Sequence, residues 1–175
     1  MTVDYSYVAA FDVKAYLWSQ LQSAGLLDAN DYFPDGFSKP LVPIFPSQEI
    51  PEMNNLLPGK TYITYDIEQK PIGESWWIAE ETMMLQIVSR SNSEILAIIN
   101  FLTDTFRRFD KSAFDVNSFI HTYNSPFKFF NFRLETANPV QPFKDEGGFM
   151  SGDFSFVYTY TRSLSDGIDN NGRYI

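Results

Sequence analysis

Two stretches of the chain repeat their apolar residues at the period of a helix. In residues 4–24 apolar side chains recur every three or four positions, and Gly25 follows at a point where a helix can end. In residues 93–110 the same spacing forms one apolar stripe, made of Ile95, Ile98, Ile99, Leu102, Phe106 and Phe109. Ser91 and Glu94 have the spacing of a capping box, in which the serine accepts a backbone hydrogen bond and the glutamate reaches back. These patterns predict an N-terminal helix and a central amphipathic helix.

Four other stretches are typical of strands. Residues 61–67 are rich in β-branched and aromatic side chains, and residues 127–135 and 154–160 place aromatic side chains on one face. The stretch 76–88 has apolar residues at both alternating sets of positions around Met83, which predicts a strand covered on both faces. We therefore expect an α+β fold, a mainly antiparallel β-sheet flanked by the two helices.

Residues 28–60 differ from their surroundings because they contain six of the ten prolines of the chain. Closely spaced prolines exclude a helix and a central strand, yet the segment is too apolar for a linker. We predict an extended arm with an edge strand near residues 41–45. Since a long segment without regular structure is often a binding segment, Phe33, Phe37 and Phe45 are candidate contact residues.

Composition limits the possible functions. The 175 residues are enough for one domain, which we place at residues 1–162, with residues 163–175 as a flexible tail. The lack of cysteine excludes disulfides, thiolate zinc sites and a catalytic thiol. A net charge of −9 without a basic cluster argues against sequence-independent binding of nucleic acid. No apolar run approaches the roughly 20 residues that span a bilayer, and Met1–Ala10 lacks the pattern of a signal peptide. We therefore expect a soluble protein made in the cytoplasm.

Aromatic side chains make up 17% of the chain, more than a domain of this size commonly needs for its own core. Such side chains are enriched at the centres of protein interfaces. The surplus indicates either a protein that assembles with partners or a core unusually rich in phenylalanine.

Few residues offer catalytic or metal-binding chemistry. His121 is the only histidine and has no nucleophile elbow to serve, so we expect a surface or loop residue. Gly147–Gly148 lacks the spacing of a phosphate loop and predicts a turn.

The carboxylate pairs are also weak candidates. Glu80–Glu81 and Asp145–Glu146 are adjacent residues, whose side chains point to opposite faces of a strand. Asp66 and Glu68 could share one face and bind a hard cation, although a solvated strand edge is the simpler interpretation. We predict no catalytic residue, no cofactor and no metal.

Trp76 and Trp77 form the most unusual dipeptide of the chain. Together they could stack on a sugar or a base. The nearby Glu74, Glu80 and Glu81 would repel a phosphate backbone. We favour an arrangement in which one tryptophan is buried and the other lies at an interface.

The middle of the chain resembles a known family. The strand Thr61-Tyr-Ile-Thr-Tyr65 is followed by Trp76-Trp77, by the strand Glu81–Ser89 and by the capped helix of residues 93–109. In this order and composition the chain resembles the tail terminator (tail completion) proteins of tailed bacteriophages. The order of elements is similar over residues 5–161, and closer likeness is confined to residues 61–109.

The resemblance implies a structural virion protein of the phage tail or neck, not an enzyme. Such proteins form a homo-oligomeric ring, commonly a hexamer, that caps the last ring of the tail tube and joins it to the head connector. The implied partners are other copies of the chain, the tail tube protein and connector or neck proteins. DNA only passes through the channel, and no membrane is involved. The candidate interface residues are Phe33, Phe37, Phe45, Trp76 and Trp77.

Other functions remain open on the sequence alone. A head-closure or sheath-capping subunit of the neck would share this composition. A monomeric carbohydrate-binding module would use Trp76 and Trp77 as its platform. An enzyme would need its carboxylates to converge on one cleft, which the sequence does not show.

Overall fold

A computed structural model of the chain describes residues 6–49, 57–71, 78–137, 141–142 and 148–162. The elements follow one another as a long helix, an arm with two short 3-10 turns, two long strands, two helices and three strands. They are α1 (Ala9–Ser23), η1 (Ala29–Tyr32), β1 (Ile44–Pro46), η2 (Ser47–Glu49), β2 (Tyr62–Pro71), β3 (Ile78–Ser89), α3 (Asn92–Phe106), α4 (Asp110–His121), β4 (Phe127–Ala137), β5 (Gln141–Pro142) and β6 (Met150–Arg162).

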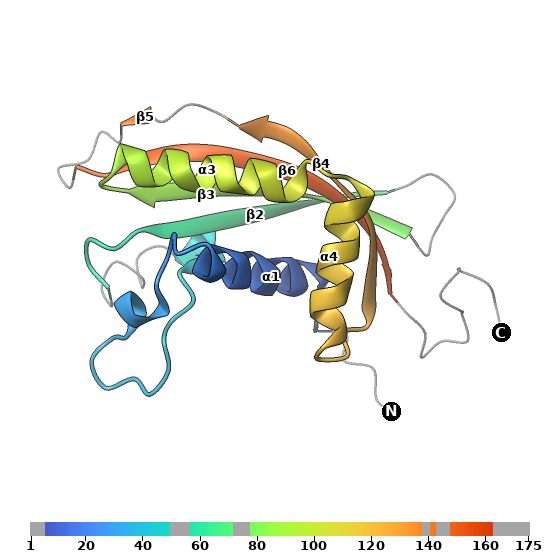
Figure 1. Cartoon of the computed structure of the whole chain (residues 1–175), viewed down its shortest axis with the longest axis horizontal. Coiled ribbons are helices and arrows are strands. Elements are labelled where there is room, and N and C mark those ends of the chain that lie inside the picture. The colour runs from blue at the N-terminus through green and yellow to red at the C-terminus, as the bar shows by residue number, and fades with distance from the viewer. Residues whose placement is uncertain (1–5, 50–56, 72–77, 138–140, 143–147, 163–175) are drawn as a thin grey trace.

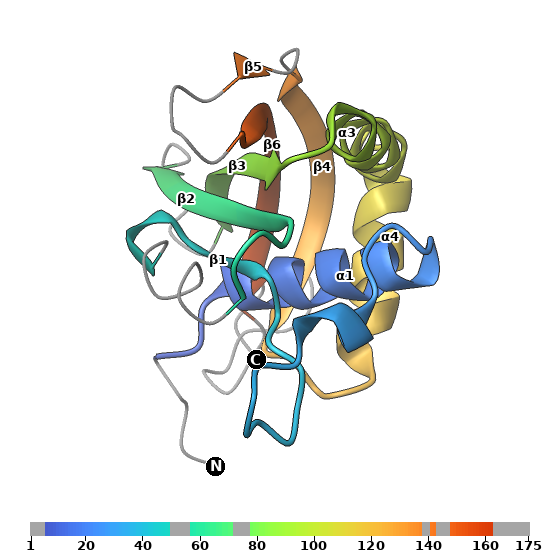
Figure 2. The same cartoon turned by 90° about the vertical axis from the view of Figure 1, so that its left-hand side faces the viewer.

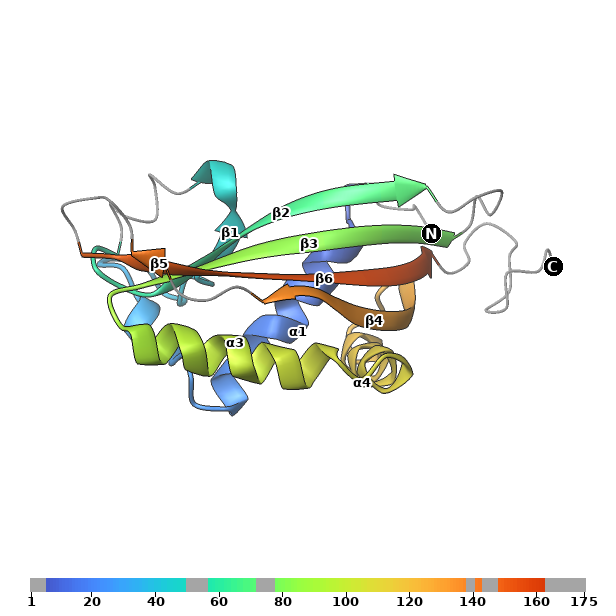
Figure 3. The same ribbon diagram turned by 90° about the horizontal axis from the view of Figure 1, so that it is seen from above.

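The strands form one mixed sheet in the order β1-β2-β3-β6-β4, with the short β5 paired to β6. The three long-strand pairings are antiparallel, and only the edge strand β1 runs parallel to its neighbour β2. The α+β fold and the mainly antiparallel sheet are therefore confirmed. The edge strand expected at residues 41–45 is present but begins later, at Ile44, and ends at Pro46. The last strand among the described residues, β6, lies between β3 and β4 in the sheet (Figure 3).

The three long helices lie on one side of the curved sheet (Figures 1 and 2). Between them and the sheet, phenylalanine rings from α3, β4 and β6 form the centre of the core. The ring of Phe106 stacks on Phe156 with centroids 4.2 Å apart and on Phe132 at 5.3 Å. All three side chains are fully buried. Many of the aromatic residues that looked surplus in the sequence therefore belong to the core.

The strand β3 is not covered equally on its two faces, contrary to the sequence prediction. Met83, Leu85 and Ile87 face the helices and are buried. On the other face Met84 is 40% exposed and Gln86 is half-buried. The reason is topological, because among the described residues all the long helices pack on the first face.

The central helix α3 begins as predicted, but one half of its capping box is wrong. The Ser91 hydroxyl accepts a hydrogen bond from the Glu94 backbone N–H at 3.4 Å. The Glu94 carboxylate does not return to the Ser91 N–H, which instead donates to the Ser89 hydroxyl at 3.1 Å. Glu94 Oε2 lies 2.8 Å from the hydroxyls of Ser89 and Thr61. The glutamate therefore binds the start of α3 to the last residue of β3 and to Thr61, the residue just before β2.

The helix α4 was missed by the sequence analysis, which placed no element between the central helix and the strand at residue 127. Its buried face has the small residues Ala113 and Val116 with Ile120, a weak apolar stripe. Its Asn117 amide bonds both backbone groups of Phe129 in the edge strand β4, each at 2.8 Å. The side chain thus takes the place that another strand would have, which protects this edge.

Two boundaries also differ from the expected ones. The first helix begins at Ala9, later than residue 4, and Val8 precedes it in an extended conformation. The helix α3 ends at Phe106, because Phe109 has φ 48° and ψ −110°, outside the helical region. The expected tail at residues 163–175 lies outside the described residues.

Candidate interaction surface

The carboxylates singled out in the sequence serve structural contacts. Glu80 and Glu81 project to opposite faces of β3, as expected for neighbours in a strand. Glu80 forms a bidentate ion pair with Arg133, with nitrogen–oxygen distances of 3.1 and 3.3 Å. Glu81 is buried and accepts hydrogen bonds from the hydroxyls of Tyr158 and Tyr160 at 2.7 and 2.6 Å. Neither carboxylate is left free to act on a ligand.

The possible cation pair, Asp66 and Glu68, lies exposed on one face of β2. Asp66 accepts a hydrogen bond from the Ser47 hydroxyl at 2.6 Å. Within the described ranges, no group of three or more histidine and acidic side chains could hold a metal ion. The pair Asp145–Glu146 and both Trp76 and Trp77 lie outside those ranges. Gly148 has φ +70°, which suits the predicted turn.

One buried carboxylate was not noticed in the sequence. Asp12 of α1 is fully buried and accepts hydrogen bonds from the hydroxyls of Tyr7, Tyr123 and Ser125. Burial, and then the hydrogen bond to Asp12 and its charge, raise the pKa of Tyr7 from 10.0 to about 12. The same causes raise the pKa of Tyr123 above its ordinary value. The cluster joins the start of α1 to the turn between α4 and β4.

The arm presents two of the predicted contact residues at the surface. Phe33 is 44% exposed and Phe37 is 49% exposed, and Val42 beside them is also exposed. Phe45 differs, because β1 places it in the core, where it is only 6% exposed and stacks on Tyr62 with ring centroids 5.5 Å apart. We call Phe33, Asp35, Phe37 and Val42 the arm surface.

The arm surface is held in a fixed shape. The Phe37 N–H donates to the Pro34 carbonyl at 3.1 Å, closing a turn in which Gly36 has φ +84°. The Leu41 N–H donates to the Tyr32 carbonyl at 2.8 Å and closes the base of the loop. Tyr32 itself is buried and donates its hydroxyl to the Thr61 carbonyl at 2.7 Å. The arm surface is therefore anchored to the core of the domain through Tyr32.

A second aromatic surface surrounds α4. Phe109 and Phe114 are 59% and 69% exposed, the two most exposed large apolar side chains among those described. Next to Phe114 lies a hollow of about 390 Å³, lined by Phe114, Asn117, Ser118, Ile120, His121, Ser125, Phe127 and Lys128. We call Arg108, Phe109, Phe114 and this hollow the helix surface. His121, at the end of α4, is an exposed residue, in agreement with the expected surface histidine.

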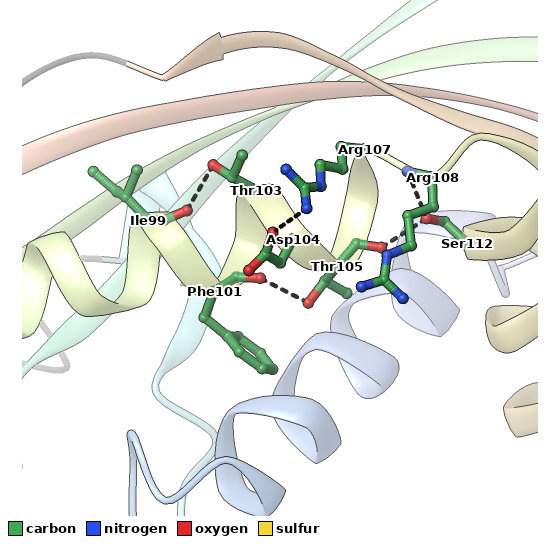
Figure 4. Close-up of polar contacts among 8 residues, drawn as sticks. All are labelled: Ile99, Phe101, Thr103, Asp104, Thr105, Arg107, Arg108 and Ser112. Atoms are coloured by element: carbon green, nitrogen blue, oxygen red, sulfur yellow. Dashed lines mark hydrogen bonds and ion pairs between the residues drawn. The ribbon is translucent and has the colours of Figure 1, made fainter.

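The junction of α3 and α4 fixes the start of the helix surface (Figure 4). The buried Ser112 hydroxyl donates to the Thr105 carbonyl at 2.7 Å and accepts from the Arg108 N–H at 3.3 Å. Arg107 forms an ion pair with Asp104 at 2.9 Å. No described carboxylate forms an ion pair with the exposed Arg108. The positive φ of the exposed Phe109 is a strained conformation of the kind that collects at functional sites.

Comparison with known protein families and with curated proteins finds no match to this chain. None of the helices in the described part of the chain has the length and apolar character needed to cross a membrane. The assignment of a function therefore depends on the two surfaces.

Sequence reasoning found Phe33 and Phe37 and missed the helix surface. Phe109 was assigned to the buried stripe of the central helix, which ends one turn earlier. Phe114 could have been noticed, since it falls outside the spacing of Ala113, Val116 and Ile120 once α4 is recognised.

Proposed function

We propose that this protein is a structural subunit that closes into a homo-oligomeric ring, and that the ring is the tail terminator of a tailed bacteriophage. One observation carries the proposal. The chain exposes two separate aromatic surfaces, and the arm and α4, which hold them, lie toward opposite ends of its long axis (Figure 1). A head-to-tail contact between two different surfaces is what generates a ring when its rotation closes.

The phage assignment is supported by the resemblance of residues 61–109. The described part of these residues forms the antiparallel strands β2 and β3 and the helix α3, which packs on β3. In a terminator ring, one side would bind the tail tube protein and the other the connector or neck proteins. An overall charge of −9 suits a channel through which DNA passes without binding.

Solution mass and electron microscopy test the ring. We expect light scattering over a range of concentrations to give one discrete mass near six times the 20.2 kDa of the chain. Negative-stain images should show a ring with a central hole wide enough for duplex DNA. A monomer at every concentration, or an open series of increasing masses, would contradict the proposal.

A second experiment tests the terminator role. The tail tube protein encoded in the same genome is allowed to polymerise with and without the purified ring. Tubes with a ring at one end and a reduced length are expected. If rings form but leave tube length and tube ends unchanged, the protein is a ring of another kind, and the terminator assignment is wrong.

A further inference from the structure

We infer that the arm surface of one copy docks into the hollow beside α4 of the next copy. This inference rests on the proposed ring and names the contact that would build it. The occupant of the hollow is therefore a second copy of this chain, with Phe37 as the residue that enters and Phe114 as the residue that receives it.

The hollow suits an aromatic side chain presented on an acidic loop. Its apolar wall is made of Phe114, Ile120 and Phe127, which can pack against an inserted ring. Its polar wall includes Lys128 and His121. Among the described residues no carboxylate lines it, although the whole chain has 22 acidic residues.

The charges of the two surfaces are complementary. Residues 28–43 of the arm contain three aspartates and one lysine, a net charge of −2. Residues 104–128 around α4 contain four basic and three acidic residues, a net charge of +1 in a chain whose total is −9. Asp35, two residues before Phe37, and Arg108, which lies at the junction before α4 and not in the wall of the hollow, are both exposed. Complementary charges of this kind fix the register of a contact and speed its formation.

The positions of the two surfaces exclude a contact within one chain and favour one between chains. Figures 1 and 3, which both show the long axis from the side, agree that the arm and α4 lie toward opposite ends of the domain. The closed loop at residues 32–41 presents Phe37 without further ordering of the arm, so little conformational entropy is lost on docking.

Two exposed substitutions test the pairing through complementation. Phe37→Asp removes the entering ring, and Phe114→Asp damages the receiving hollow; both side chains are about half or more exposed, so both variants should fold. Each variant alone is expected to be a monomer of 20.2 kDa. Mixed together, the intact arm of the second can dock in the intact hollow of the first. The mixture should therefore form a one-to-one dimer of about 40 kDa and grow no further.

Leu96→Asp is the matched control. Leu96 is 48% exposed on α3 and belongs to neither surface. This variant should keep the wild-type ring mass, which shows that a new exposed aspartate does not by itself prevent assembly.

A charge exchange tests the register. Asp35→Lys and Arg108→Asp should each weaken the ring, measured as a higher concentration for half-assembly. The double variant should recover at least part of the loss. If the double variant loses as much assembly free energy as the two single variants together, the two residues do not form a pair, and that contact is overturned.

The outcomes separate this inference from the proposed function. A ring that survives both Phe37→Asp and Phe114→Asp overturns the docking while the ring proposal stands. Two monomeric variants that do not complement each other indicate like-with-like contacts, which also overturns the docking. A wild-type chain that never assembles removes both proposals together.

Discussion

Gly152 of β6 lies so close to two isoleucines of α3 that even a methyl group does not fit at this position. A Cβ atom at this residue would lie 2.6 Å from Ile99 Cδ1 and 2.7 Å from Ile95 Cγ2. Carbon atoms pack best about 3.5–4.0 Å apart, so Gly152→Ala requires a displacement of roughly 1 Å in the helix or in both isoleucines.

The expected size of the effect follows from two opposing contributions. Overpacking of a tight core costs about 1–3 kcal/mol. Replacing glycine also removes freedom from the unfolded chain, which stabilises the protein by about 0.4–1 kcal/mol. The net loss therefore lies between about 0 and 2.6 kcal/mol. Because two contacts would be shorter than 3 Å, we expect Gly152→Ala to lie in the upper part of this range and to lower the free energy of unfolding by about 1–2.5 kcal/mol.

A double-mutant cycle, with each variant unfolded in urea, measures the clash between a Cβ atom at residue 152 and the Ile99 side chain. Ile99→Val removes the Cδ1 atom, and alone should cost about 0.5–1.5 kcal/mol. In a protein that already carries Gly152→Ala, Ile99→Val also relieves the clash. Its loss in free energy of unfolding should therefore be smaller than in the wild type, by at least about 0.5 kcal/mol. Ser151→Ala, one residue away on the opposite face of β6, serves as the control. An unchanged stability for Gly152→Ala, or a strictly additive cycle, would refute the reasoning.

Three other predictions concern buried polar groups. Asp12→Ala should lower the free energy of unfolding by about 2–4 kcal/mol, measured by urea denaturation, because three hydroxyls lose their acceptor. Asn117→Ala should cost about 1–3 kcal/mol by the same assay, since both backbone groups of Phe129 lose a partner. Burial is the largest cause that raises the pKa of Tyr7 and Tyr16 from 10.0 to about 12. The stability that these tyrosines contribute is therefore complete below pH 10 and is lost as the pH rises toward about 12, which tyrosinate absorbance and circular dichroism should follow together.

Each of these expectations has a clear contrary result. A loss below about 1 kcal/mol for Asp12→Ala would show that the hydroxyls find water as an equal partner. Ser118→Ala, at an exposed position of α4, is the control for Asn117→Ala and should be nearly neutral. Ionisation of all tyrosines near pH 10 without loss of structure would contradict the alkaline prediction.

The sequence predicted those elements whose determinants are local. The stripe from Ile95 to Phe106 and the cap at Ser91 are both contained within one helix, so the pattern alone was enough. The partner of Glu94 was predicted wrongly because Thr61 lies far away in the sequence, just before β2. Phe45 was predicted to be an arm contact because its surroundings also come from a distant segment. It becomes a core residue only when β1 pairs with β2 and its ring stacks on Tyr62.

The candidate surfaces were only half predictable. The proline spacing around Phe37 identified the arm, because proline restricts the chain whatever surrounds it. The helix surface was missed, because the positive φ of Phe109 divides one apolar pattern into two helices. The break between α3 and α4 is stabilised by contacts such as the hydrogen bond from the Ser112 hydroxyl to the Thr105 carbonyl. The residue types at these positions do not predict that contact.

The place of β6 in the sheet bears on how the protein is made in the cell. β3 and β4 are both synthesised before the strand that joins them, β6 (Met150–Arg162). Until β6 has left the ribosome, both neighbours expose unpaired edges and the phenylalanine core lacks Phe156. Such a nascent chain is prone to aggregation and would depend on chaperones. Insertion of β6 therefore brings β3, β4 and the ring of Phe156 together in one event, which joins the two halves of the sheet and completes the phenylalanine core.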